Sequence, residues 1–169
     1  ILGAVMHTYP KGEDEAGADA NLQAIAAELR GSGKKPYIIP LAPGHPPLGA
    51  LGYVRAAAEI LDQLADAHYQ IDEIVVASGS GNTHAGLLFG LRALDSDITV
   101  TGACVRRDRE AQLARITTRC QEIAALLETE SPVQRQDIQL TDDTFAPGYG
   151  HLNDATHEAI DLSARLEGL

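Results

Sequence analysis

The stretch of residues 74–86 restricts the fold of this chain more than any other segment. Residues 74–77, Ile-Val-Val-Ala, form an apolar run of the length of a buried strand, and a helix-like pattern runs from residue 83 to about residue 94. Between them lies the loop 78–83, Ser-Gly-Ser-Gly-Asn-Thr. A strand, a small-residue loop and a helix in this order are typical of α/β proteins that hold a phosphate with backbone N–H groups and a helix N-terminus.

The loop differs from two common nucleotide-binding motifs. It contains no lysine, so it does not match the P-loop G-x-x-x-x-G-K-[ST], and His84 follows Asn82-Thr83, so it does not match G-x-G-x-x-G. A small, fixed phosphate, such as that of a cofactor, fits better than a nucleoside triphosphate. For the loop taken alone, a turn that joins a strand to a helix and binds nothing remains an equal alternative. His84 is interpreted as a structural residue at the start of the helix.

Strand and helix patterns alternate along the rest of the chain. We expect strands over residues 1–6, 37–39, 74–77, 98–105 and 138–140, and helices over residues 16–30, 48–67, 83–94, 109–127 and from a cap at 153 to about 167. This order predicts an α/β fold of three layers, a mostly parallel sheet with helices on both faces. The loops 41–47, 78–83 and 142–150 each follow a strand, so we expect them to meet at the carboxyl edge of the sheet.

Composition excludes several classes of partner. The formal net charge of −11 disfavours nucleic acid and anionic membranes, which need a basic surface. No apolar run approaches the ~20 residues that span a bilayer. Cys104 and Cys120 are interpreted as buried thiols of a cytoplasmic protein, and no cysteine spacing predicts a metal site. Residue 1 is Ile inside an expected strand, so we expect residues 1–169 to be part of one domain of a longer chain.

The three loops together resemble one enzyme family. The segments IIPLAPGHPPLGALGYV (38–54), VVASGSGNTHAGLLFGL (75–91) and DDTFAPGYG (142–150), followed by LSARLEGL (162–169), resemble the D-cysteine desulfhydrase and 1-aminocyclopropane-1-carboxylate deaminase family. The resemblance runs in order across nearly the whole chain, and the desulfhydrase branch is the more similar one. It implies a pyridoxal-phosphate enzyme of fold type II, the tryptophan-synthase-β-like fold, that forms a homodimer.

The resemblance also implies roles for individual residues. The cofactor phosphate would be bound through backbone N–H groups and hydroxyls of the loop residues Gly79, Ser80, Gly81, Asn82 and Thr83. Tyr149 matches an active-site tyrosine that approaches the substrate and the cofactor ring, where a phenol can relay a proton or orient the substrate. Without the resemblance, a packed aromatic in a Pro-Gly turn would be the preferred interpretation of Tyr149.

The implied reaction is an α,β-elimination on a small amino acid. A D-cysteine desulfhydrase would convert its substrate to pyruvate, ammonia and sulfide. A 1-aminocyclopropane-1-carboxylate deaminase and a lyase for a sulfonated amino acid are alternatives within the family. A binding domain for a phosphorylated ligand, without catalytic activity, is an alternative from another class.

Several departures from the family pattern bear on this expectation. The family's cofactor-binding lysine lies in a Gly-Asn-Lys segment, and none of Lys11, Lys34 and Lys35 has that context. The family's Gln-Ser-Asn-His segment, which holds the substrate carboxylate, is also absent from residues 1–169, and its second active-site tyrosine would follow Leu169. We therefore expect the parent protein, and not this segment alone, to be a competent enzyme.

Two further departures concern the substrate. His45 stands in a loop where the family has Gly-Gly-Ser-Asn, and it is a candidate contact for an anionic or sulfur-bearing leaving group. Arg106 and Arg107 stand where the family tends to have Ser-Arg, and they would suit a more anionic substrate. The alternatives are a surface histidine in a turn and arginines that pair with Asp108 or Glu110.

Overall fold

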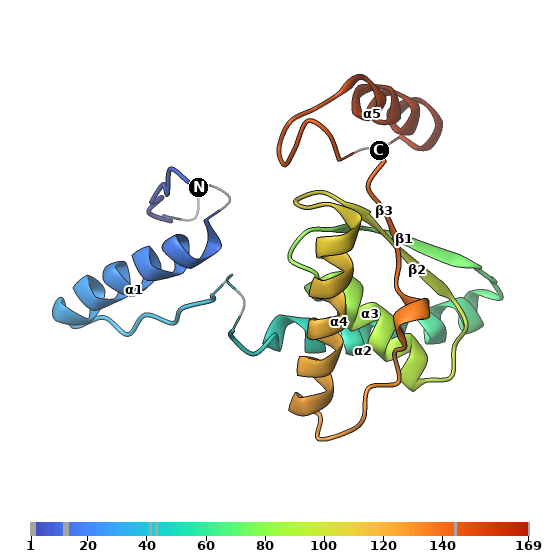
Figure 1. The fold of residues 1–169 in the computed structure, drawn as a ribbon, viewed down its shortest axis with the longest axis horizontal. Helices are drawn as coiled ribbons and strands as arrows, with labels where there is room; N and C mark the ends of the chain where they lie inside the picture. The colour runs from blue at the N-terminus through green and yellow to red at the C-terminus, as the bar shows by residue number, and fades with distance from the viewer. Residues whose placement is uncertain (1–2, 12–13, 41, 43, 144, 169) are drawn as a thin grey trace. The chain divides into compact units, whose positions relative to one another are not determined.

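The computed structural model describes residues 3–11, 14–40, 42, 44–143 and 145–168 (Figure 1). The chain forms two compact units, Ile1–His45 and Pro46–Leu169. No helix in these described ranges is both long and apolar enough to cross a membrane.

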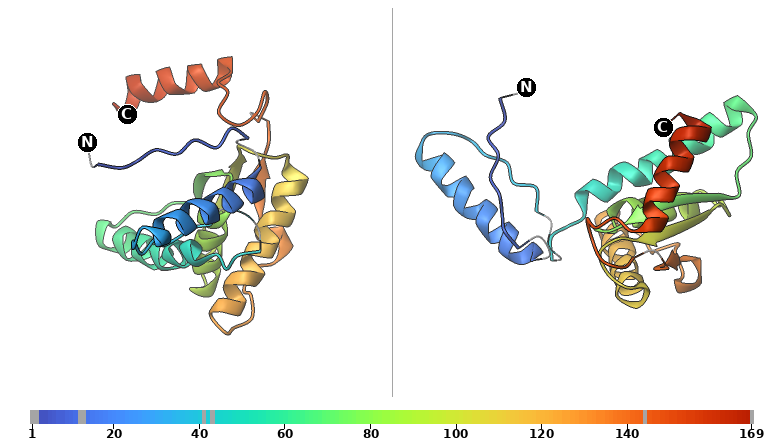
Figure 2. Two further views of the ribbon diagram at one scale, coloured as in Figure 1. Left: turned by 90° about the vertical axis from the view of Figure 1, so that its left-hand side faces the viewer. Right: turned by 90° about the horizontal axis from the view of Figure 1, so that it is seen from above.

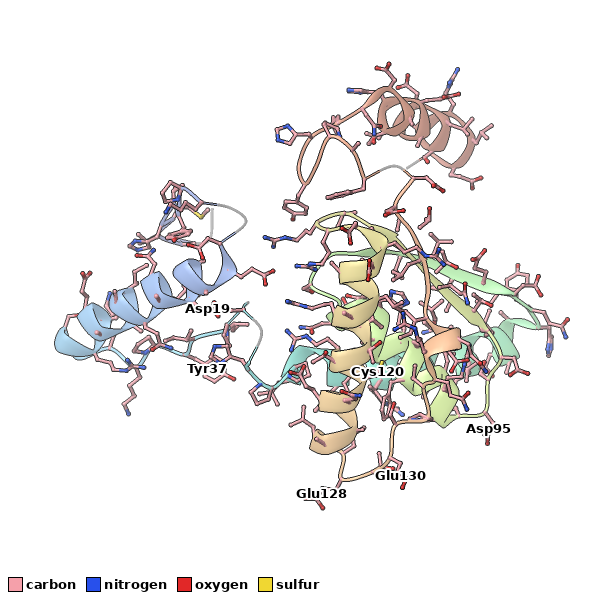
Figure 3. The ribbon with its side chains drawn as sticks, in the orientation of Figure 1. Asp19, Tyr37, Asp95, Cys120, Glu128 and Glu130 are labelled. Atoms are coloured by element: carbon pink, nitrogen blue, oxygen red, sulfur yellow. The ribbon has the colours of Figure 1, made fainter. Side chains whose placement is uncertain are left out.

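The first unit contains one helix, α1 (Glu15–Gly31). Its N-cap is Asp14, whose carboxylate accepts a hydrogen bond from the N–H of Gly17 at 2.8 Å. The strand predicted over residues 37–39 is wrong, and so is the part of the strand over 1–6 that the structure describes, residues 3–6. A strand needs a neighbour that pairs with its backbone, and neither segment has one among the residues that the structure describes. The side chain of Tyr37 is 81% exposed (Figure 3).

The second unit is built on a parallel sheet of three strands in the order β1-β2-β3 (Figures 1 and 2). These are β1 (Glu73–Ser78), β2 (Thr99–Cys104) and β3 (Gln139–Thr141). Ser78 pairs with Cys104 in register, and Ala103 pairs with Thr141. The carboxyl ends of all three strands therefore lie at one edge. The predicted α/β class and parallel sheet are confirmed, with strand ends shifted by one residue.

In the described part of the second unit, the helices have bounds close to the predicted ones: α2 (Leu48–Ala67), α3 (Asn82–Ala93), α4 (Arg109–Leu126) and α5 (Asp154–Glu167). A short 3-10 helix, η1 (Arg135–Asp137), precedes β3. α3 contacts β1 and β2, α4 contacts β3 and α3, and α2 packs along α3. α3 and α4 lie on the sheet face whose side chains in β2 are buried, whereas Val75, which points to the other face, is 66% exposed.

Two glycines let α3 lie close to α2. A Cβ atom on Gly86 would overlap the carbonyl oxygen of Ala50 and the Cβ of Tyr53. A Cβ atom on Gly90, one turn later, would overlap the Val54 carbonyl and the Cβ of Ala57. Because the two glycines are four positions apart, they form one stripe of α3 against which the backbone of α2 rests. This contact fixes where the N-terminus of α3 lies at the sheet edge.

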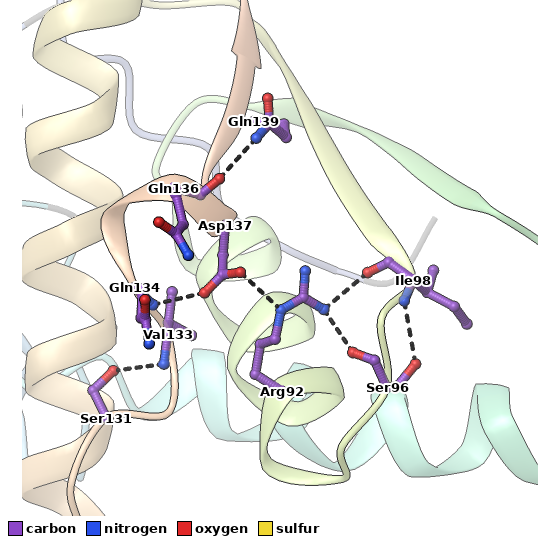
Figure 4. A network of polar contacts seen from close by, with 9 residues as sticks. All are labelled: Arg92, Ser96, Ile98, Ser131, Val133, Gln134, Gln136, Asp137 and Gln139. Carbon is purple, nitrogen blue, oxygen red and sulfur yellow. Dashed lines mark hydrogen bonds and ion pairs between the residues drawn. The ribbon is translucent and has the colours of Figure 1, made fainter.

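The amino edge of the sheet is held by one arginine. Nε of Arg92, near the end of α3, lies 3.2 Å from Oδ1 of Asp137 in η1. Its Nη1 donates to the carbonyl oxygens of Ser96 at 2.7 Å and Ile98 at 3.1 Å, in the segment that leads into β2 (Figure 4). Both side chains of the Arg92–Asp137 pair are largely buried. The pair therefore ties the entries of β2 and β3 to α3, at the edge opposite the loop that follows β1.

The two cysteines are buried free thiols, as the sequence predicts. Burial raises the pKa of the Cys120 thiol to about 12. Cys120 lies on α4 (Figure 3), and burial also raises the pKa of Cys104 at the end of β2. Both thiols are therefore protonated at neutral pH and pack as small apolar side chains.

Candidate functional site

The candidate site is the loop that leads from β1 into α3. Ser78 ends the strand, Gly81 caps the helix, and Asn82 is its first residue. Gly81 has a φ of +89°, in the left-handed region that glycine adopts at little cost. The first N–H groups of α3 have no acceptor within the helix, and the helix dipole adds partial positive charge there. This end of α3 can therefore bind an anion.

The carbonyl oxygens of the loop are directed toward arginines. Nη1 of Arg107 donates to the carbonyl oxygen of Gly79 at 2.5 Å, and Nε of Arg115 donates to that of Ser80 at 2.9 Å. These peptide bonds are trans, so each N–H points opposite to its C=O. The N–H groups of Ser80 and Gly81 therefore point away from the two guanidinium groups. These two N–H groups therefore lie on one side of the loop. The carbonyl oxygens of Gly79 and Ser80, which accept hydrogen bonds from the two arginines, lie on the other.

Close neighbours also leave little room for a side chain at Gly79 and Gly81. A Cβ on Gly81 would lie 3.0 Å from Cδ1 of Ile116 in α4. A Cβ on Gly79 would lie 3.2 Å from Cγ2 of Val105, just after β2. The loop thus lies flat against α4 and the β2–α4 connection, which leaves its N–H side for a ligand. Donors at a helix N-terminus on a flat, glycine-lined loop fit a phosphate monoester.

A buried polar cluster contacts the start of the loop at Ser78. Gln112, which is fully buried, donates from Nε2 to Oγ of Ser78 at 2.7 Å and accepts at Oε1 from Arg107 at 2.8 Å. Oγ of Ser78 also lies 3.2 Å from Nδ1 of His84. Since Ser78 accepts from Gln112, its own proton can be donated to His84. This cluster joins the end of β1, the start of α3 and the first turn of α4.

His84 is a neutral structural residue of this cluster. Its side chain is fully buried, and burial lowers its pKa to about 4, although the Val100 carbonyl partly opposes this shift. The imidazole lies on β2 at Gly102, where a Cβ atom would overlap the ring. The sequence analysis interprets His84 as a structural residue, and its burial against β2 agrees with that interpretation.

Asn82 and Thr83 complete the predicted phosphate loop as the first two residues of α3. The backbone N–H of Asn82 lies 3.5 Å from Oγ of Ser80. Oδ1 of Asn82 is buried and takes no hydrogen bond from the residues that the structure describes. An unsatisfied buried amide oxygen is costly, so a donor on a bound ligand would stabilise this residue.

Tyr149 lies at the same edge of the sheet as the loop. The guanidinium carbon of Arg106 is 5.0 Å from the centroid of the Tyr149 ring, within the range of a cation–π contact. The Arg106 side chain also passes Gly79, since a Cβ there would lie 3.6 Å from its Cγ and Cδ. Arg106 therefore connects two predicted site elements, the loop after β1 and the loop after β3. Tyr149 itself is 54% exposed.

His45 lies in the first unit, where it faces an acidic residue. Its Nε2 is 3.6 Å from Oδ2 of Asp19, which also accepts a hydrogen bond from the N–H of Ala42 at 2.9 Å. A contact between His45 and a substrate stays a prediction. Residues 41 and 43 of the predicted loop 41–47 lie outside the described residues.

Sequence reasoning missed three residues that hold the loop: Arg107, Gln112 and Arg115. The sequence predicts Arg107 to be a surface charge or an anion contact, and it predicts no role for the other two. The sequence holds one signal for such a network. Gln112 and Arg119 are seven positions apart, so they share a face of the expected helix, and they fall among its apolar positions. Both are buried in the structure. Polar residues on the buried face of a helix indicate a network.

Comparisons with known proteins show the family to which the chain belongs. The family described as pyridoxal-phosphate dependent enzyme matches residues 1–169. The D-cysteine desulfhydrases of Salmonella paratyphi C (strain RKS4594) and Salmonella typhi are 44% and 43% identical to the chain over 151 residues. Each alignment covers 89% of this chain and 44% of the relative, so the chain spans less than half the length of these relatives.

A solved structure gives the same result at the level of the fold. The crystal structure of an ACC deaminase homologue matches with a TM-score of 0.80 and 35% identity, over 99% of this chain and 49% of that chain. The predicted fold class, that of fold type II pyridoxal-phosphate enzymes, is thereby confirmed. The chain belongs to the family of pyridoxal-phosphate dependent enzymes.

Proposed function

We propose that the protein containing this chain is a pyridoxal-phosphate-dependent lyase of the D-cysteine desulfhydrase type. The observation that carries the proposal is the loop 79–83 at the N-terminus of α3, in which the N–H groups of Ser80 and Gly81 face away from Arg107 and Arg115. The 44% identity to D-cysteine desulfhydrases supports the choice of reaction. The net reaction is D-cysteine and water to pyruvate, ammonia and hydrogen sulfide.

In this proposal the cofactor phosphate is bound by the loop. The N–H groups of Ser80, Gly81 and the first turn of α3 donate to the phosphate oxygens, and the hydroxyls of Ser80 and Thr83 are additional donors. Pyridoxal phosphate, when bound, supplies an electron sink for the bond that breaks at the α-carbon. The loop's part is to fix one end of the cofactor, so that the reacting atoms meet in a constant geometry.

Tyr149 is the proposed catalytic residue of this chain. It lies at the carboxyl edge of the sheet, where ligands of α/β proteins bind, and Arg106 restrains its ring. Its phenol can orient the substrate or transfer a proton as the α-hydrogen and the β-thiol leave. His45 is the proposed contact for the leaving group, because an imidazole N–H can donate a hydrogen bond to a departing thiolate.

The protein is further proposed to be a cytoplasmic homodimer. Two buried thiols that form no disulfide suit a reducing compartment. The dimer follows from the family resemblance alone. Light scattering on the eluted peak of a gel-filtration column tests it, and a monomeric mass would reject it.

The reaction is tested with the purified full-length protein. Pyruvate and sulfide released together from D-cysteine, and more slowly from L-cysteine, are the expected result. Ammonia released from 1-aminocyclopropane-1-carboxylate without turnover of D-cysteine would favour the deaminase, to which the 35% identity with an ACC deaminase homologue lends support. Sulfite released from a sulfonated amino acid would favour the lyase for sulfonated amino acids. Binding of pyridoxal phosphate with no turnover of any of these substrates would favour a binding domain.

A further inference from the structure

The loop 79–83 is held on its acceptor side by three side chains from one region of the chain. Arg107 stands two residues before α4, and Gln112 and Arg115 stand three positions apart in its first half. Arg107 and Arg115 donate to the carbonyl oxygens of Gly79 and Ser80. Consecutive peptide units of the loop are thus each held by a different guanidinium group.

Gln112 connects this arrangement to the core. Its Oε1 accepts from Arg107, and its Nε2 donates to Oγ of Ser78 at 2.7 Å and lies 3.4 Å from the carbonyl oxygen of Gly79. Gln112 is fully buried, so its amide is fixed in one orientation by these partners. The buried amide of Gln112 therefore fixes the orientation of the Arg107 guanidinium group.

The direction of these hydrogen bonds decides what the loop can bind. A glycine-rich segment has many accessible backbone conformations, and only some of them turn consecutive N–H groups to the same side. Holding the carbonyl oxygens of Gly79 and Ser80 selects the conformation in which the next two N–H groups face a common ligand. Hydrogen bonds from charged donors are the strong ones, which suits them to this task.

We propose that Arg107, Gln112 and Arg115 are positioning residues of the cofactor-phosphate site, which preset the loop 79–83 for the phosphate by binding its carbonyl oxygens from the opposite side. This inference rests on the proposed function, because it takes pyridoxal phosphate as the ligand of the loop. The three residues do not contact the phosphate in this arrangement. They act on it through the peptide units of Gly79-Ser80 and Ser80-Gly81.

The test compares two ligands that differ only in the phosphate. The affinities of the full-length apoprotein for pyridoxal phosphate and for pyridoxal are measured by equilibrium titration. A change in this ratio between variants reports the phosphate contact, because the ring is shared and the internal hemiacetal of free pyridoxal is the same for every variant. Arg115→Met is the principal variant, since Arg115 is only partly buried. Arg107→Met is the second, in case one of the two does not fold.

Arg109→Met is the matched control. It removes the same charge from the same helix at an exposed position. The hydrogen bond of residue 109 to Asp142 comes from the backbone and is kept. We expect the ratio of affinities to fall about tenfold in Arg115→Met and in Arg107→Met, as for the loss of one charge-assisted hydrogen bond. We expect it to change less than about twofold in Arg109→Met, because exposed charges are screened.

The outcomes separate the inference from the proposed function. If every folded arginine variant keeps the wild-type ratio, as Arg109→Met does, the positioning role is wrong while the cofactor proposal stands. If the wild-type protein binds pyridoxal phosphate no more tightly than pyridoxal, the proposed phosphate site itself is wrong. Circular dichroism melts confirm that each variant included in the comparison is folded.

Discussion

Gly81 and Ile116 lie so close that any side chain at position 81 would press on the isoleucine. A Cβ on Gly81 would be 3.0 Å from Cδ1 of Ile116 and 3.4 Å from Cγ of Arg115. The φ of Gly81, +89°, adds a second restriction, since left-handed backbone costs other residues about 1–2 kcal/mol. Loop conformation and packing against α4 therefore both favour glycine at position 81.

The first prediction is that Gly81→Ala weakens pyridoxal phosphate binding by about tenfold or more, because strain and crowding together move the loop. The affinity of the full-length protein for the cofactor measures this. Gly33→Ala is the control, because Gly33 also has a positive φ, +78°, but a Cβ there meets nothing within 4 Å. Wild-type affinity in Gly81→Ala would contradict the prediction that the crowded, left-handed backbone at position 81 is needed for phosphate binding.

The second prediction concerns Tyr149. Tyr149→Phe keeps the ring that Arg106 covers at 5.0 Å but removes the phenol. We expect the rate of pyruvate formation from D-cysteine to fall by about 10²–10⁴-fold, the usual range for loss of a group that transfers a proton. Cofactor affinity should stay unchanged, since Tyr149 is not assigned to the phosphate. A rate within about twofold of wild type would mean that Tyr149 is a packing residue.

The third prediction concerns the contact between α2 and α3. Gly86→Ala should destabilise the full-length protein by about 1–3 kcal/mol, because its Cβ would overlap the backbone of α2 at Ala50. Gly52→Ala is a control on the facing helix, where a Cβ meets nothing within 4 Å. That change should be neutral or stabilising by up to about 1 kcal/mol, since Ala has the higher helix propensity. Urea denaturation measures both, and equal effects would refute the close packing.

The fourth prediction follows from the buried imidazole of His84. Its pKa is about 4 in the folded protein and 6.5 when unperturbed, so the unfolded state binds the extra proton first as the pH falls. The stability that this group contributes is fully present above pH 6.5 and is lost as the pH falls toward 4. Between pH 7.5 and 5 the loss is about 2 kcal/mol, given 1.36 kcal/mol for each pKa unit.

His84→Asn isolates this contribution, because Asn cannot titrate and its amide can still reach Oγ of Ser78. Urea denaturation at pH 7.5 and at pH 5 should show a smaller pH-dependent loss in the variant, by about 2 kcal/mol. Carboxylates that titrate in the same pH range contribute equally to the stability of both proteins, so their contribution cancels in the difference between the two. An equal loss in both would show that His84 is accessible to protons in the folded state.

Most of the second unit could be predicted from the sequence because its signals are local. The apolar run 74–77, the glycines of the loop and the helical spacing of α2 and α4 each reflect one element, and the structure places them within a residue or two. The strands predicted over residues 3–6 and 37–39 are wrong for a physical reason. A short apolar run forms a strand only if a neighbour pairs with it, and pairing is a property of the tertiary fold.

The support of the loop could not be predicted for a related reason. Arg107 and Gly79 are 28 positions apart, and Arg115 and Ser80 are 35 apart. Hydrogen bonds from a side chain to a backbone carbonyl select no partner residue type, so no motif marks them. The phosphate loop itself is recognisable because both of its requirements, glycine and a following helix, lie within a few residues.

Amide hydrogen exchange shows whether residues 79–83 bind the phosphate of pyridoxal phosphate. The full-length protein is compared in the presence of saturating pyridoxal phosphate and of saturating pyridoxal. We expect the phosphate to slow exchange at the N–H groups of Ser80 and Gly81 and in the first turn of α3, and we expect pyridoxal not to do so. Equal exchange at these amides with both ligands would contradict phosphate binding by this loop.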